Sequence, residues 1–322
     1  MTEASIQIRS CQGLALIQDY GRPAARQHAC PIGGAADIYG FRCAQALAGN
    51  PANTPAIELT LGRLELEYSG TQALTLAFAG DAHECAINGE AQPSWSTLTL
   101  RAGDCLSLLS NHRGLRSYLA FAAEWHDLDI WMDSAATLLA VKRGGHQGRS
   151  LEAGDELILT SPRSGHARSL PWSAIPKSSC RIAVLPGPQA TNFCKTDIRH
   201  FYRQPWRISA KSDRRGIRLE GPPLSGPITA QLISEPVVPG AVQILPDGQP
   251  LILMQDGPTT GGYPKIGQLT QPALARLAQK VPGDIIRCEK QDIQSARQQW
   301  QDWQQQLDSL PSLLIERGLT RD

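Results

Sequence analysis

The 322-residue sequence has no excess of either charge, no long apolar run and no paired-cysteine motif. Its 31 Lys and Arg residues balance 30 Asp and Glu residues to a net charge of +1, which argues against a strongly basic surface for nucleic acid. The longest uncharged apolar run covers only residues 69–80, whereas crossing a bilayer takes about 20 apolar residues. We therefore expect no nucleic acid and no membrane among the partners.

No secretory leader is expected either, because the first residues show no basic start followed by an apolar stretch. The 8 cysteines are scattered, and none forms a Cys-x-x-Cys pair or a compact cluster with histidine. Thiols spaced in this way are typical of a reduced protein. The sequence thus predicts a cytoplasmic protein without disulfides and without a metal site.

The motifs that bind nucleotides or carry covalent cofactors are also missing. There is no Gly-x4-Gly-Lys-Ser/Thr phosphate loop, no Gly-x-Gly-x-x-Gly after a strand, no His-Glu-x-x-His and no Gly-x-Ser-x-Gly. No lysine lies in the Ala-Met-Lys-Met context that carries covalent biotin. Chemistry that uses ATP or a carried carboxyl group is therefore expected to depend on a partner chain.

With 29 glycines and 23 prolines the chain is rich in turns, which favours short strands over long helices. Apolar and polar residues alternate at 57–61 and 64–68, and Gly62-Arg63 between them predicts a hairpin. Asn88-Gly89 predicts a second hairpin. Further strands are expected at 74–78, 97–100, 105–109, 118–121, 156–159, 182–185, 207–210, 242–245 and 251–254.

Two helices are expected in the body of the chain. Asp37 is placed to cap a helix over 38–48, and Gly49 is placed to end it. Pro272 stands at the first turn of a helix that continues over 273–280.

The C-terminal stretch has apolar residues at 293, 296, 300, 303, 307 and 310, a spacing that alternates between 3 and 4 and predicts a helix. This apolar seam either packs on its own domain or docks against a partner, with Trp300 and Trp303 as anchors. A Ser- and Pro-rich stretch without periodicity precedes residue 180. The predicted organisation is an N-terminal β-rich domain at 1–165, a linker at 166–179, a C-terminal domain at 180–292, and a helix with a tail at 293–322.

Four segments combine glycine with polar residues. The first, 18–23, follows an apolar run and either offers Asp19 and Arg22 to a small polar substrate or forms a turn with a local ion pair. The second, 31–37, either exposes backbone N–H groups to an anion or serves helix capping by Asp37.

The third segment, 211–219, surrounds Asp213 with four basic residues, Arg214 among them. It suits recognition of a carboxylate or phosphate, and its alternative is a charged hairpin loop in water. The fourth, 255–267, follows a strong strand, and its adjacent glycines allow close approach of the backbone to an oxyanion. Its polar and glycine residues are Asp256, Thr259, Thr260, Gly261, Gly262, Tyr263 and Lys265.

These segments, in this order, resemble the biotin-dependent carboxyltransferase family, also called the allophanate hydrolase subunit 2 and KipA family, over about residues 10–290. The matching stretches are 18–22, 33–37, 47–50 with 57–58, 144–149, 212–219, 234–240, 259–265 and 278–279 with 282–284. The chain departs from the family pattern at Pro258, where glutamine is usual, and at Arg215, where methionine is common. It also departs at Gly33 and Ala36, where serine and methionine are usual.

The resemblance implies a mainly β fold of two β-barrel-like domains related to cyclophilin, with a few helices and a C-terminal helix. Bacterial members include the C-type subunit of 5-oxoprolinase, whose complex opens 5-oxo-L-proline to L-glutamate with ATP hydrolysis. The resemblance therefore implies a C-type subunit that is active only with a KipI-like, B-type subunit and an A-type subunit. ATP would be used by that complex, and the subunit that binds it is left open.

The same resemblance, together with the chemistry of the residues, predicts a site for a small-molecule substrate. Cations and N–H donors are needed where an oxygen gains charge, and carboxylates can orient a substrate N–H or a water. The catalytic candidates are Asp19, Arg22, Asp213, Arg214, Asp256 and Lys265. The substrate-binding candidates are Asp37, Arg149, Thr259, Thr260, Gly261, Gly262 and Tyr263.

Two other functions fit the same family. The chain is alternatively a carboxyltransferase subunit that acts on urea or a related amide with a biotin carrier. As a third possibility, it is a non-catalytic, KipA-like antagonist of a KipI-like regulator. Neighbouring genes for a biotin carrier and a biotin carboxylase would favour carboxyl transfer.

Overall fold

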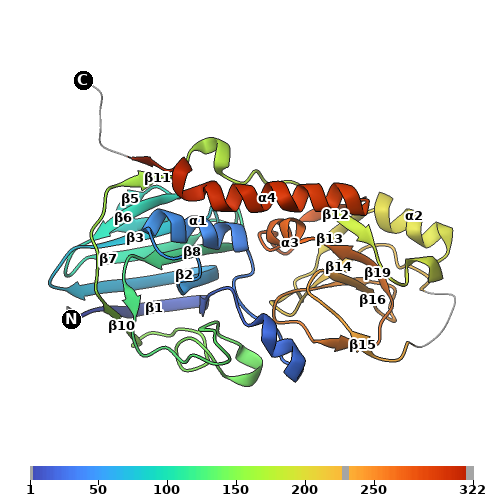
Figure 1. Ribbon diagram of the computed structural model, residues 1–322, viewed down its shortest axis with the longest axis horizontal. Helices are drawn as coiled ribbons and strands as arrows, with labels where there is room; N and C mark the ends of the chain where they lie inside the picture. Colours follow the sequence, from blue (N-terminus) through green and yellow to red (C-terminus); the bar gives the residue numbers. More distant parts are fainter. Residues whose placement is uncertain (1–2, 227–231, 317–322) are drawn as a thin grey trace. The chain divides into compact units, whose positions relative to one another are not determined.

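The computed structural model describes residues 3–226 and 232–316, and the chain divides into two compact units (Figure 1). The first unit combines residues 1–21, 33–176 and 306–322, and the second combines Arg22–Ile32 with Lys177–Gln305. The division at 176/177 falls inside the stretch predicted as a linker, whereas nothing in the sequence indicated that 22–32 joins the second unit. Residues 317–322 of the predicted tail lie outside the described part of the chain.

The first unit is built on a 12-stranded sheet, in the order β21-β11-β6-β3-β8-β2-β1-β10-β9, with β7, β4 and β5 branching from β2. Its strands are β1 (Glu3–Gln18), β2 (Ala56–Gly70), β3 (Leu74–Ala79), β4 (His83–Ile87), β5 (Glu90–Gln92), β6 (Ser96–Leu100), β7 (Cys105–Ser110), β8 (Arg116–Phe121), β9 (Glu124–Trp125), β10 (Glu156–Thr160), β11 (Arg168–Ser169) and β21 (Ile315–Glu316). Leu, Ile and Phe side chains from these strands form its core. Helix α1 (Ile38–Ala48) packs on β3 and β8. Short 3-10 turns lie at Leu139–Val141 and Trp172–Ala174.

Two local predictions for this unit are confirmed. Helix α1 begins at the Asp37 cap and ends at Gly49, which adopts a left-handed conformation. Strands β4 and β5 form a hairpin around Asn88-Gly89, whose φ angles of +51° and +85° are those of the tight turn that suits twisted strands.

The hairpin predicted at Gly62-Arg63 is wrong, because β2 runs through both residues as one strand. The register between β1 and β2 shifts between Gln12 and Leu14, opposite this point. Gly62 has φ +75°, and a Cβ there would lie 1.6 Å from the carbonyl oxygen of Gln12. The glycine therefore permits an irregularity within a long strand pair rather than a reversal of the chain.

The second unit is a closed barrel with the strand order β12-β19-β16-β17-β14-β13-β20, beside a two-stranded ribbon of β15 and β18. The barrel strands are β12 (Arg181–Pro186), β13 (Pro205–Ile208), β14 (Gly216–Glu220), β16 (Ala241–Ile244), β17 (Pro250–Leu253), β19 (Lys265–Leu269) and β20 (Ile285–Lys290). The ribbon strands are β15 (Glu235–Pro236) and β18 (Thr260–Gly261), the helices are α2 (Lys195–Arg203) and α3 (Gln271–Leu277), and 3-10 turns lie at Pro23–His28 and Ala190–Asn192. The prediction of a mainly β fold with barrel-like domains is confirmed.

The C-terminal seam forms helix α4 (Ile293–Leu313), the long red helix in Figure 1. Leu307 and Leu310 are buried, and Gln306 Nε2 donates to the hydroxyl of Tyr39 at 2.9 Å within the first unit. This part of the seam packs on its own chain. Trp300 is 44 % exposed, and docking of a partner there stays a prediction.

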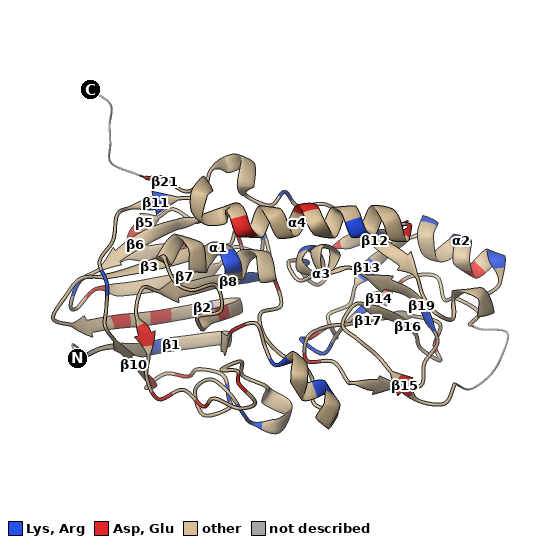
Figure 2. Ribbon diagram, viewed as in Figure 1, with Lys and Arg blue, Asp and Glu red and all other residues tan. Residues whose placement is uncertain are grey.

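All 8 cysteines are free thiols. Figure 2 shows acidic and basic residues interspersed in each unit, in keeping with the balanced charge of the sequence. Among the described helices, none has the length and apolar character that a membrane span requires.

His83 makes the first unit sensitive to acid. Its side chain is buried, Nδ1 lies 3.0 Å from Ser117 Oγ, and burial lowers the pKa of the imidazole to about 4. The unfolded chain, with a histidine pKa of about 6.5, then binds more protons below that pH, and stability is lost as pH falls from 6.5 towards 4.

Between pH 7.5 and pH 5 this one residue is expected to remove about 2 kcal/mol of stability. Urea unfolding of the wild type and of His83→Gln at both pH values measures it, because the variant lacks the titrating group. An equal pH dependence in the two proteins contradicts the assignment.

Candidate functional site

The second unit contains a polar cluster around Lys265, at the start of β19. Lys265 is 5 % exposed, and its Nζ donates to Oε1 of Glu235. Gln189 Nε2 donates to the same oxygen at 2.7 Å, and Gln189 Oε1 accepts from the backbone N–H of Lys265 at 3.1 Å. The hydrogen bond from Lys265 lowers the pKa of Glu235, so the residue is a carboxylate at neutral pH. We call these three residues the Lys265 cluster.

A bulge in β19 brings Gln243 alongside this cluster. The register between β16 and β19 shifts after Val242, so that Gln243 pairs with Lys265 and Ile266 is the extra residue. Directly paired residues of an antiparallel sheet present their side chains on the same face. Gln243 is 2 % exposed, and its Nε2 has no hydrogen-bond partner. The barrel wall therefore carries an ammonium and a carboxamide side by side.

The glycine-rich loop lies against the same residues. Strand β18 pairs with β15, which sets Gly261 opposite Glu235. A Cβ at position 261 would lie 2.4 Å from Gln243 Nε2, so the close approach of this loop requires glycine. The backbone N–H of Val237 donates to the carbonyl of Thr259 at 2.9 Å and holds the loop to the strand that carries the carboxylate.

The segment Arg22–Ile32 adds a further support to this loop. Arg26 donates to the carbonyl of Val237, and Thr259 Oγ1 donates to a carbonyl of the segment at 3.3 Å. Arg22 stands at the start of the segment with its side chain buried. The predicted residues Arg22 and Thr259 thus belong to one connected set of loops in the second unit.

Arg214 and Asp256 form a buried ion pair in the second unit. Nε and Nη2 of Arg214 donate to the two carboxylate oxygens of Asp256 at 2.8 and 3.0 Å, and both side chains are less than a tenth exposed. This two-point geometry ties the end of β17 to the loop before β14. Asp213 is exposed, and its Oδ1 accepts from the N–H groups of Arg215 and Gly216.

In the first unit, Asp19 organises three loops from a buried position. Its Oδ1 accepts from the N–H of Gly21 and the hydroxyl of Ser134, each at 2.7 Å. Its Oδ2 accepts from the N–H of Ala135 at 2.7 Å, and its own carbonyl accepts from Ala35 at 2.8 Å. Both carboxylate oxygens are therefore engaged in holding the fold.

Asp37 acts as the helix cap that was one of its two predicted roles. Its Oδ1 accepts from Tyr39 and Gly40 at 3.0 and 3.2 Å. Its own N–H donates to the hydroxyl of Tyr118, which in turn donates to the buried Glu58 at 2.7 Å. Burial raises the pKa of Tyr118, so the hydroxyl keeps its proton and this chain of hydrogen bonds persists.

Arg149 is also engaged within the first unit. It donates to both oxygens of Asp155 at 2.8 and 2.6 Å. Burial works to raise the pKa of Asp155, but the bonds from Arg149 and from the backbone of Glu152 outweigh it, and the pKa is lowered. The pair fixes the loop that leads into β10.

The chain matches the family model described as carboxyltransferase domain, subdomain A and B, over residues 28–290. The chain belongs to this carboxyltransferase-domain family. It is 36 % identical over 301 residues to the C-type subunit of 5-oxoprolinase from Escherichia coli K12, covering 90 % of this chain and 94 % of that protein. It is 30 % identical over 302 residues to urea amidolyase of Saccharomyces cerevisiae, covering 87 % of this chain but 16 % of that enzyme. The crystal structure of Kluyveromyces lactis urea carboxylase matches 99 % of this chain and 30 % of its own with a TM-score of 0.88 and 25 % identity.

In this member of the carboxyltransferase-domain family, the second unit brings together several predicted residues. Lys265 lies with the Thr259–Gly262 loop, and Arg214 lies with Asp256. Tyr263 follows that loop and is 44 % exposed. Asp19, Asp37 and Arg149 lie in the first unit.

Glu235, Gln189 and Gln243 were not among the candidates predicted from the sequence. Glu235 stands within the 234–240 stretch that carries the family resemblance, so it was visible but not selected. The only sign of Gln243 in the sequence is that it is a polar residue inside an apolar strand. Their roles depend on strand pairing and on the bulge in β19, which residue spacing does not reveal.

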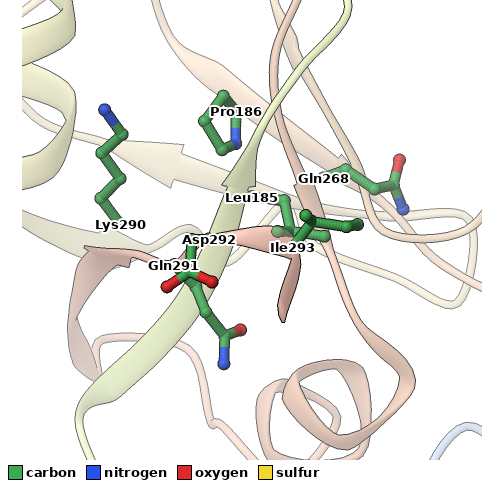
Figure 3. Close-up of a pocket in the computed structure, with 7 residues that line it drawn as sticks. All are labelled: Leu185, Pro186, Gln268, Lys290, Gln291, Asp292 and Ile293. Atoms are coloured by element: carbon green, nitrogen blue, oxygen red, sulfur yellow. The ribbon is translucent and has the colours of Figure 1, made fainter. Parts of the chain in front are cut away.

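A separate groove of about 680 Å³ lies where β12, β19 and the start of α4 meet (Figure 3). Its lining residues are Leu185, Pro186, Gln268, Lys290, Gln291, Asp292 and Ile293. None of the predicted site residues lines it. Asp292 accepts from the N–H groups of Gln294 and Ser295 and so serves as the cap of α4.

Removal of the Asp256 carboxylate and removal of the Asp213 carboxylate are expected to change the free energy of unfolding by very different amounts. Asp256→Ala leaves the buried Arg214 guanidinium without its carboxylate and is expected to cost about 3 kcal/mol. Asp213→Ala removes an exposed turn acceptor and is expected to cost about 0.5 kcal/mol. Denaturant unfolding measures both, and equal losses contradict the structural assignment of the ion pair.

Proposed function

We propose that this chain is the C-type subunit of an ATP-dependent 5-oxoprolinase, which opens 5-oxo-L-proline to L-glutamate. The supporting observation is the correspondence with the C-type subunit of the Escherichia coli 5-oxoprolinase, which covers 90 % of this chain and 94 % of that protein. Because the match covers nearly the whole length of both proteins, it favours the same role for this chain. On this proposal the active enzyme also contains a KipI-like, B-type subunit and an A-type subunit.

The reaction needs activation, because a lactam amide is a poor electrophile. ATP enters as a substrate of the complex: its γ-phosphoryl group bonds to the lactam carbonyl oxygen and ADP leaves. Water then attacks the activated carbon, the ring C–N bond breaks, and hydrolysis of the acyl phosphate releases glutamate and phosphate. The groups that this chemistry requires are fixed donors for the carbonyl oxygen and an acceptor for the ring N–H.

We assign these roles to the second unit. Lys265 supplies a cation, and the backbone N–H groups of the loop over Thr259, Thr260, Gly261 and Gly262, with the Thr260 hydroxyl, supply further donors to the lactam oxygen. Glu235 supplies a carboxylate that is 39 % exposed and therefore has lone pairs available to a ligand. Tyr263 is exposed enough to stack on the substrate or to donate to it.

The remaining predicted residues have supporting roles on this proposal. The Arg214–Asp256 pair and Arg22 position the loops of the second unit, and the exposed Asp213 orients a water. Asp19, Asp37 and Arg149 hold the loops of the first unit. Substitution at these buried positions changes the fold and the reaction together, whereas Lys265 offers a cleaner test.

Reconstituted with its co-encoded A-type and B-type partners, the wild-type chain is expected to form glutamate from 5-oxo-L-proline and ATP. Lys265→Met keeps the length of the side chain but removes the ammonium, and is expected to lower kcat/KM at least about 100-fold. Its folding is expected to survive, because the exposed side of Glu235 can be hydrated. Glutamate release and the unfolding temperature are measured in parallel.

Lys290→Met is the matched control, since Lys290 is an exposed lysine of the separate groove. This control is expected to retain full activity. Loss of activity in Lys290→Met with full activity in Lys265→Met moves the site to the groove and contradicts the assignment.

A second candidate function is carboxyl transfer to urea or a related amide, favoured by the TM-score of 0.88 with urea carboxylase. A complex of this kind incorporates labelled bicarbonate into urea when a biotinylated carrier, a biotin carboxylase and ATP are supplied. A well-folded complex without either activity favours the KipA-like antagonist of a KipI-like regulator, and Pro258→Gln then tests whether the family glutamine restores turnover.

A further inference from the structure

The carboxamide of Gln243 is a buried donor without an acceptor. The residue is 2 % exposed, and its Nε2 has no hydrogen-bond partner. The register shift between β16 and β19 places Gln243 directly opposite Lys265. A buried N–H donor that forms no hydrogen bond is unfavourable, since water is lost and nothing replaces it. A ligand that reaches Gln243 would supply the missing acceptor.

The neighbours of Gln243 define which ligand would do so. On one side lies the Lys265 ammonium, a second donor, and beside it lies the Glu235 carboxylate, which accepts only. Two donors and one acceptor match a small amide in which a C=O and an N–H stand next to each other. A lactam ring has this arrangement, because ring closure sets its C=O and N–H on the same side, and so does urea.

We propose that Gln243 is a specificity-determining residue that donates from Nε2 to the carbonyl oxygen of a small lactam or urea-like amide whose N–H bonds to Glu235. The inference deepens the proposed function and rests on the Lys265 cluster being its substrate site. Gln243 recognises the amide class, and the reaction that follows depends on the other subunits.

Gly261 controls access to this donor. A Cβ at position 261 would lie 2.4 Å from Gln243 Nε2, so the glycine loop covers the amide closely. The ribbon that carries the loop pairs only two residues of each strand, Glu235 with Gly261 and Pro236 with Thr260. Opening the loop breaks these two pairs, the Val237–Thr259 hydrogen bond and the bond of the Thr259 hydroxyl, so it is a local event that can admit a ligand to the covered amide.

Gln243→Met tests the proposal, because methionine keeps the approximate shape and removes the donor. Removing an unpaired buried donor is expected to leave the unfolding temperature unchanged or higher. Binding of 5-oxo-L-proline and of urea to the full chain is expected to weaken about tenfold, equivalent to about 1.4 kcal/mol. Ligand titrations followed by thermal unfolding give both quantities from one experiment.

Gln249→Met is the matched control within the same barrel. The Gln249 amide is fully used: Oε1 accepts from the N–H of Gly221 and Nε2 donates to its carbonyl, each at 2.9 Å. This substitution is expected to lower the unfolding temperature and to leave ligand affinity unchanged. The two glutamines are thus predicted to show opposite patterns.

A second pair of variants tests the same proposal without changing Gln243. Gly261→Ala is expected to displace the Gln243 amide and to weaken binding by a similar factor. Gly165→Ala, where a Cβ would meet only Thr75 Oγ1 at 3.9 Å, is expected to change neither affinity nor stability.

The proposal is overturned if the wild-type chain binds neither probe, or if Gln243→Met and Gly261→Ala bind both probes as the wild type does. Glutamate formation by the reconstituted complex separates this result from the proposed function. Binding of urea that depends on Gln243, without turnover of 5-oxo-L-proline, supports the recognition of an amide and contradicts the 5-oxoprolinase assignment.

Discussion

The contact between the Lys265 ammonium and the Glu235 carboxylate joins the barrel wall to the short ribbon that carries the glycine loop. A buried ammonium is stable only with a counter-charge, and the loop lies in place only while its strand is held. Gln189 completes the contact by bonding to both residues. The position of Gly261, and with it the covering of Gln243, depends on this ion pair together with the hydrogen bonds of Val237 and Thr259.

The predicted carboxylates Asp19 and Asp37 of the first unit are used more completely than Glu235 and Gln243 of the second. Asp19 and Asp37 in the first unit accept several hydrogen bonds from backbone N–H groups, and these bonds fix loops and a helix start. In the second unit, Glu235 is partly exposed and Gln243 has a donor left over. A fully bonded buried group serves the fold, whereas an incompletely bonded one is costly unless a ligand completes it. This contrast is why we locate recognition of the substrate in the barrel unit.

Local rules of sequence predicted the parts of the fold that depend on a few adjacent residues. The Asp37 cap and the Asn88-Gly89 turn were identified because capping and tight turns are encoded within four residues. Gly62 was misinterpreted because its meaning depends on the facing strand β1, about fifty residues earlier in the chain. The link from Lys265 to Glu235 spans thirty residues, and the missing partner of Gln243 is a property of the folded barrel. No spacing in the sequence encodes either of these.

A crystal structure of the reconstituted complex with 5-oxo-L-proline tests the central claim most directly. The account predicts the lactam at the Lys265 cluster, with its carbonyl oxygen within hydrogen-bond distance of Lys265 Nζ and Gln243 Nε2, and its N–H on Glu235. A lactam bound in the groove beside α4, or on a partner protein with the Gln243 amide still covered by Gly261, would contradict it.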